Sequence, residues 1–119
     1  HDIRKERLPK PSNIVILSNI LWYILDNIVD VMNNSIMSLE PSDTGEMHLL
    51  IHNAWFREGK QKYGLDIVSS LNDIVIYLSK SIKNAKYIKL IAIDACVLNI
   101  INSKYDEVYI MASFVNSEL

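Results

Sequence analysis

Two histidines and an acidic residue lie close together near the middle of the chain. His48 and His52 are four residues apart, and Glu46 precedes them. On a helix, this spacing would place both imidazole rings on one face, as in many zinc sites. The H-E-x-x-H motif is absent and no third ligand is evident in the sequence. Two partly buried histidines on a strand are therefore the favoured interpretation, and a metal site is the alternative.

The second half of the chain contains a cysteine and an aspartate that could also do chemistry. Cys96 is the single cysteine, and it would need a neighbouring base to act as a nucleophile. Because Ala95 and Val97 flank it, we predict that it is a small buried hydrophobe. Asp94 is predicted to cap a helix that begins near Cys96, and a metal-ligand role is the alternative.

Apolar runs that alternate with amphipathic stretches predict the elements that position these residues. Strands are predicted at 13–18, 47–52, 87–94 and 107–114, and helices at 20–35, 65–83 and 96–104. This alternation is typical of α/β proteins with a mostly parallel sheet covered on both faces. The predicted fold is thus a small, Rossmann-like three-layer sandwich. The alternative is an all-helical chain in which 87–101 forms one buried helix.

In a parallel sheet, residues that face a ligand lie where the strands end at their carboxyl edge. Ser18 and Asn19 end the first predicted strand, and Asp94 ends the third. A metal-dependent hydrolase would need several carboxylates there, and only Asp94 qualifies. Glycine-rich phosphate loops are missing from the sequence as well. We therefore expect no catalytic, cofactor or metal site, with an enzyme that uses Asp94, Ser18 and Asn19 as the alternative.

Two aromatic pairs and the N-terminal segment are the candidate contact surfaces. Trp22 and Trp55 each begin an aromatic pair near a predicted strand end, where such residues can form an interaction surface. Residues 1–12 carry four basic and two acidic side chains and two prolines. They are predicted to form a flexible basic arm, and residues 13–119 a single α/β domain.

The composition limits the classes of partner. Half of the 119 residues are apolar and the net charge is −2, so no overall basic field indicates nucleic acid. No apolar run reaches the 18 residues that a membrane span requires. A single cysteine cannot form an internal disulfide, which favours a nuclear or cytoplasmic protein that is not secreted.

The corner after the first predicted strand resembles a known family. Residues 16–23, Ile-Leu-Ser-Asn-Ile-Leu-Trp-Tyr, are similar to the first strand-to-helix corner of the von Willebrand A-like small core subunit of transcription factor TFIIH. That corner reads approximately Leu-Asp-Thr-Asn-Pro-Ile-Trp-Trp, so Leu17 replaces the aspartate and Ile20 the proline. Residues 45–64 and 93–98 resemble further segments of the family, and the latter match would extend the late strand to Leu98.

The resemblance implies a von Willebrand A-like domain that serves as a non-catalytic scaffold. It would be a protein-interaction subunit of a nuclear complex for transcription and DNA repair, with other protein subunits as partners. Metal-binding A-domains carry an Asp-x-Ser-x-Ser pattern at this corner; residues 17–21 lack its acid and its last serine, so this corner should not hold magnesium. The alternatives are a small metal-dependent α/β hydrolase and an all-helical viral module. The viral module is suggested because residues 63–67 and 95–97 of the chain resemble segments of the Bcl-2-like immune modulators of poxviruses.

Overall fold

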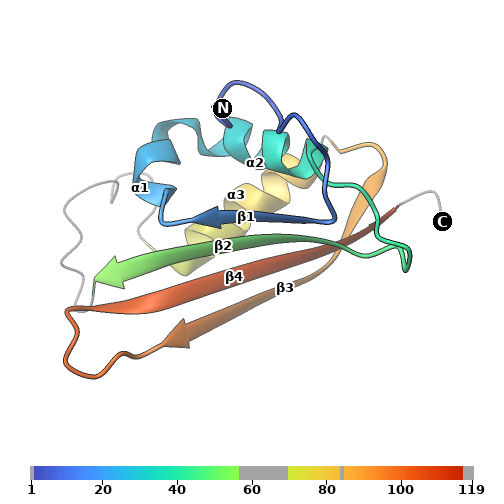
Figure 1. The fold of residues 1–119 in the computed structure, drawn as a ribbon. Helices are drawn as coiled ribbons and strands as arrows, with labels where there is room; N and C mark the ends of the chain where they lie inside the picture. Colours follow the sequence, from blue (N-terminus) through green and yellow to red (C-terminus); the bar gives the residue numbers. More distant parts are fainter. Residues whose placement is uncertain (1, 57–69, 84, 117–119) are drawn as a thin grey trace.

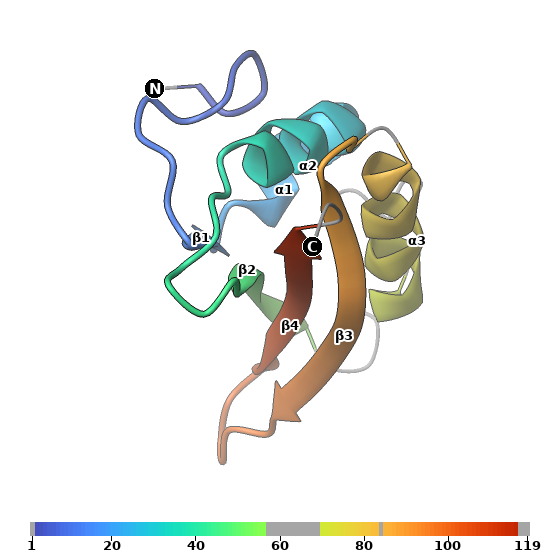
Figure 2. The same ribbon diagram turned by 90° about the vertical axis from the view of Figure 1, so that its right-hand side faces the viewer.

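A computed structural model describes residues 2–56, 70–83 and 85–116. In this part of the chain a twisted four-stranded sheet carries helices on one of its faces (Figures 1 and 2). The strands are β1 (Ile14–Ser18), β2 (Met47–Phe56), β3 (Ile88–Leu98) and β4 (Tyr105–Asn116). The helices are α1 (Leu21–Ile24), the short 3-10 helix η1 (Leu25–Asn27), α2 (Ile28–Met37) and α3 (Leu71–Ile82).

The strands lie in the order β1-β2-β4-β3. β1 pairs with β2 in parallel, whereas the β2–β4 and β3–β4 pairs are antiparallel. The α/β class is therefore confirmed, and the prediction of a mostly parallel sheet is wrong. The reason is the short connection of residues 99–104 between β3 and β4, because only antiparallel neighbours can be joined without a long crossover.

The helix predicted at 96–104 does not form. β3 continues to Leu98, and its last residues pair with β4, with Cys96 opposite Tyr109. The chain then turns through Asn102, whose φ of 61° lies in the left-handed region that asparagine tolerates. β3 ends at Leu98, where the family resemblance had placed the end of the strand.

The core lies between the sheet and the helices. Leu49 and Phe114 from the sheet pack with Val31 and Leu78 from the helices, and all four side chains are buried. Ser70 caps the N-terminus of α3, because its hydroxyl oxygen accepts a hydrogen bond from the backbone N–H of Asp73 in the first turn. The described residues form two layers, whereas the predicted sandwich had three. The four strands also exclude the all-helical alternative.

Residues 2–12, predicted as an arm, run beside α2. Asn34 Nδ2 donates a hydrogen bond to the carbonyl of Ile3 at 2.8 Å, and the backbone N–H of Leu8 donates to Ser38 Oγ at 2.8 Å. Ile3 and Leu8 also pack against the core. Within the described residues, no helix is both long and apolar enough to cross a bilayer.

Candidate functional site on the open face of the sheet

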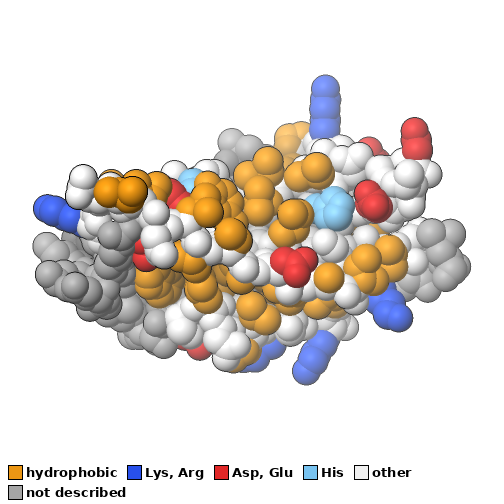
Figure 3. All heavy atoms as spheres, turned by 90° about the horizontal axis from the view of Figure 1, so that it is seen from below, with side chains coloured by type: hydrophobic (Ala, Val, Ile, Leu, Met, Phe, Trp, Pro, Cys, Tyr) orange, Lys and Arg blue, Asp and Glu red, His pale blue; other side chains and the backbone are white. Residues whose placement is uncertain are grey.

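The face of the sheet that points away from the helices is the candidate site. Side chains alternate along β1, β2 and β4, so one set is buried under the helices and the other faces outward, whereas most residues of β3 are exposed on both faces. We term the second set the open face; it comprises Ile14, Ile16, Ser18, His48, Leu50, His52, Ala54, Lys89, Ala92, Asp94, Cys96, Leu98, Glu107, Tyr109, Met111, Ser113 and Val115. Figure 3 shows hydrophobic side chains spread across the molecule on this side, with acidic and histidine side chains among them.

A hydrogen-bonded serine, histidine and glutamate cross three strands of the open face. Ser18 Oγ lies 2.8 Å from His52 Nδ1, and His52 Nε2 lies 2.5 Å from Glu107 Oε2. The Tyr109 ring stacks on the imidazole, with ring centroids 4.6 Å apart. We term Ser18, His52 and Glu107 the Ser18 triad. Its serine is exposed, whereas the His52 and Glu107 side chains are only 17% and 24% exposed.

For neutral His52, the hydrogen bonds of the Ser18 triad determine which ring nitrogen carries the proton. A carboxylate has no proton to donate, so neutral His52 must carry its proton on Nε2, which faces Glu107. Nδ1 then presents a lone pair to Ser18 Oγ. The serine hydroxyl is therefore the donor, which is the orientation that a general base requires.

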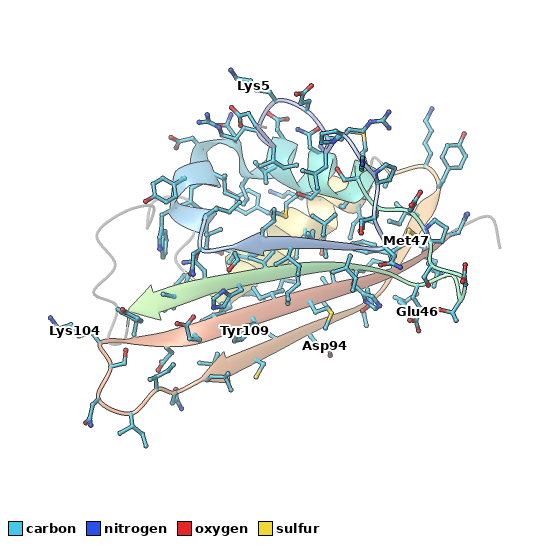
Figure 4. All side chains as sticks on the ribbon, in the orientation of Figure 1. Lys5, Glu46, Met47, Asp94, Lys104 and Tyr109 are labelled. Atoms are coloured by element: carbon cyan, nitrogen blue, oxygen red, sulfur yellow. The ribbon has the colours of Figure 1, made fainter. Side chains whose placement is uncertain are left out.

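A second group of the same composition occupies the other end of β2. Ser113 Oγ lies 3.1 Å from His48 Nδ1, and His48 Nε2 lies 3.9 Å from Glu46 Oε2. The latter distance is too long for a hydrogen bond. We term these residues the Ser113 group. Its carboxylate, labelled in Figure 4, is 66% exposed.

The residues predicted at the strand ends divide between the two sides of the sheet. Asn19 follows Ser18 with a φ of 53°, and its backbone N–H donates to the His52 carbonyl at 2.8 Å. Trp22 and Trp55 meet, with ring centroids 5.6 Å apart, and both pack against the core. One tryptophan from each predicted aromatic pair thus meets the other at the helix side of the sheet, whereas Tyr23 is 80% exposed.

Two predictions for β3 are wrong. Asp94 lies within the strand, opposite Met111, and does not cap a helix, because no helix follows it (Figure 4). Cys96 is exposed, whereas it was predicted to be buried. Both errors have one cause, which is that an outward-facing edge strand here has the apolar composition of a buried one.

The structure does not assemble the enzyme that the sequence offered as an alternative. Ser18 and Asp94 lie on the two edge strands, which are three strand spacings or about 14 Å apart, and Asp94 is displaced by two further residues along β3. His48 and His52 share a face of β2, but residues four apart on a strand are separated by about 13 Å. Among the described residues, no three His, Cys, Asp or Glu side chains form a group that could hold a metal ion.

The sequence reasoning missed Glu107 and Tyr109. Tyr109 lies directly opposite His52, and Glu107 is two residues before it on the same face of β4. An antiparallel register between these two strands would have revealed both residues, but the register is not readable from either strand alone.

No family model matches the chain, and no curated protein matches it.

Proposed function

We propose that the chain is a protein-interaction subunit that acts as a scaffold and binds another protein through the open face. The supporting observation is its exposed apolar surface. Ile16, Leu98 and Met111 are 59%, 50% and 39% exposed, respectively, although they lie in the middle or near the end of regular strands. Extended apolar patches on soluble domains mark interaction sites.

The size of the open face suits a partner of domain size. β1 has five residues and the other three strands have ten to twelve, so strands spaced about 4.8 Å apart cover an area of about 600 Å². A standard protein–protein interface buries about 800 Å² on each partner. A single partner that covered the open face and its rim would therefore form an interface of ordinary size.

The charges of the open face favour a different protein over a second copy of this chain. Acidic side chains outnumber basic ones on this face: Asp94 and Glu107 lie within it and Glu46 at its rim, whereas Lys89, opposite Val115, is the basic residue at the start of β3. Two copies packed face to face would bring acidic groups together, which opposes association. The expected partner presents apolar side chains with a lysine or arginine placed to meet Asp94.

The narrower proposal is that this partner belongs to a nuclear transcription and DNA-repair complex similar to TFIIH. Its support is the sequence resemblance at residues 16–23, 45–64 and 93–98. In the family that the chain resembles, the small subunit pairs with a zinc-binding partner within the core complex. That partner subunit is accordingly the first binding candidate.

The test measures binding of the purified chain to each recombinant TFIIH core subunit by calorimetry. Ile16→Lys places a charge on the apolar β1 side of the open face and should weaken binding at least about tenfold, because an unpaired charge would be buried. Met37→Lys is the matched control, since Met37 is 54% exposed on α2, away from this face. Sedimentation of the chain alone should show a monomer.

Two outcomes would contradict parts of this proposal. If no core subunit binds, the TFIIH-like assignment fails. If a subunit binds and the Ile16 and Met37 variants lose affinity equally, the open face is not the docking surface. A stable dimer that Ile16→Lys dissociates would show that the occupant is a second copy.

A further inference from the structure

The Ser18 triad has the arrangement that activates a serine hydroxyl in acyl-transfer enzymes. The hydroxyl meets one nitrogen of His52 at 2.8 Å, and a carboxylate holds the other nitrogen at 2.5 Å. Ser18 is exposed at the last position of β1, so an external carbonyl can reach it. We propose that Ser18 is a nucleophile for ester carbonyls, an activity beyond the scaffold role proposed above.

The surroundings of His52 hold its ring in the productive orientation. Glu107 accepts the Nε2 proton and would stabilise the imidazolium that forms when Nδ1 takes the proton of Ser18. Tyr109 stacks on the imidazole with an interplanar angle of 23°. The ring is thus fixed by two hydrogen bonds and one aromatic contact before any substrate binds, and this preorganisation is what a general base requires.

The turn after Ser18 contains a backbone donor for the oxyanion. The N–H of Asn19 is bonded to the His52 carbonyl at 2.8 Å, and that of Leu21 to Asn53 Oδ1 at 3.3 Å. The Ile20 N–H between them has no hydrogen-bond partner in the described part of the chain. We assign to this N–H the role of donating a hydrogen bond that stabilises the negative charge on the carbonyl oxygen in the transition state.

The next row of the open face indicates the class of ester. Ile16, Leu50 and Met111 lie side by side across β1, β2 and β4, one row from Ser18, His52 and Tyr109. They form an apolar floor for an acyl chain, and Lys89, the lysine of the open face, lies at the opposite end of β3 from the row of Ser18, too far to bind an anionic substrate there. The substrate is therefore a neutral ester with an apolar acyl group.

The reaction proceeds in two balanced steps. In the first, Ser18 Oγ bonds to the carbonyl carbon, its proton moves to His52 Nδ1, and the alcohol leaves with that proton as the ester C–O bond breaks. In the second, a water molecule gives a proton to His52, and the oxygen of that water bonds to the same carbonyl carbon. The acyl–serine bond then breaks, the carboxylic acid leaves, and the Ser18 hydroxyl is restored.

The first experiment labels the whole chain with a fluorophosphonate probe and locates the adduct by peptide mass spectrometry. Attack by Ser18 should expel fluoride and leave the phosphonyl group on its Oγ. Ser113 is the internal control, because it also contacts a histidine but lacks a hydrogen-bonded carboxylate. We expect label on Ser18 and none on Ser113.

The second experiment measures release of 4-nitrophenol from 4-nitrophenyl butyrate. Ser18→Ala should reduce the rate to that of buffer, Ser113→Ala should leave it unchanged, and His52→Gln should lower it by about two orders of magnitude. Glu107 is a positioning residue, so Glu107→Gln should lower kcat and leave KM unchanged. Circular dichroism of each variant checks that the sheet is intact.

Absence of label from Ser18, or equal labelling of Ser18 and Ser113, would overturn the proposal. So would a Ser18→Ala variant that retains the full rate. The labelling experiment needs no variant, so a substitution that fails to fold cannot obscure it. Partner binding by the open face is measured separately, and a failure of either test leaves the other proposal standing.

Discussion

The two serine–histidine–glutamate groups on the open face have the same composition and different geometry. In the Ser18 triad the carboxylate hydrogen-bonds to the imidazole at 2.5 Å, whereas in the Ser113 group the corresponding distance is 3.9 Å. The source of the carboxylate explains this difference. Glu107 comes from β4 and is the diagonal neighbour of His52, within reach of a long side chain. Glu46 lies two residues before His48 on the same segment. A carboxylate from the neighbouring strand therefore completes the group, and one from the same strand does not.

The largest expected difference is in stability. His52→Ala removes two hydrogen bonds and a ring contact and leaves the partly buried Glu107 without its partner. We expect a loss of about 2 kcal/mol in the free energy of unfolding. His48→Ala should cost less than half as much, because it breaks one hydrogen bond of 3.1 Å. Urea denaturation of the two variants measures both values, and equal losses would remove the distinction between the groups.

A second prediction separates the aromatic contact from the hydrogen bonds. Tyr109→Leu keeps an apolar side chain opposite His52 but removes the stacked ring. The loss should be about 1 kcal/mol, since aromatic pairs contribute about 0.5–1.5 kcal/mol beyond the area that they bury. The double variant with His52→Ala should lose less than the sum of the single variants. Additive losses would mean that the ring does not support the imidazole.

The two glutamates offer a smaller contrast. Glu107→Gln keeps a hydrogen-bond acceptor and removes the charge, so we expect a loss of about 1 kcal/mol. Glu46→Gln should leave the unfolding free energy unchanged within error, because its carboxylate is 66% exposed and 3.9 Å from His48. A measurable loss for the Glu46 variant would indicate that the Ser113 group closes in solution.

The smallest expected effect concerns another pair two residues apart, Asp2 and Arg4. The Arg4 guanidinium hydrogen-bonds to the Asp2 carboxylate and lowers the pKa of that group to about 2 from the usual 3.8. The contact thus favours the folded arm above pH 4, and its contribution disappears as the pH falls through 2. A carbon-detected NMR titration should show a midpoint near 2, and Arg4→Gln should raise it part of the way toward 3.8, because glutamine keeps the backbone N–H that also donates to Asp2. An unchanged midpoint in the variant would exclude Arg4 as the cause.

The sequence predicted the local elements better than their pairing. The run at 13–18 marks β1, because a short apolar run is visible in the chain itself, and the helical stripe predicted at 65–83 marks α3 over Leu71–Ile82. Residues 65–69 of that predicted helix lie outside the described residues. The β-branched run that ends at Leu98 has no such signal for its end. Whether the strand stops at Asp94 or continues depends on its pairing with β4, and the residues of the run alone do not indicate that pairing.

In the candidate site, too, the sequence predicted local features better than contacts between strands. Ser18 was singled out as a strand end, and His52 was interpreted as a partly buried strand histidine; the structure agrees with both. Glu107 was not found, because its place beside His52 is set by the antiparallel register of β2 and β4. A register that depends on tertiary packing leaves no local pattern in either strand.

The strand order has a consequence for the sequence of events in folding. β3 and β4 form a hairpin across a short connection, and such hairpins close within about 1–10 μs. β1 must instead find β2 in parallel across residues 19–46, and this non-local pairing forms more slowly. We expect β1 to dock late and to open first, so its amide hydrogens should exchange with solvent before those of β4. Ser18 would then join His52 and Glu107 in one of the last steps of folding.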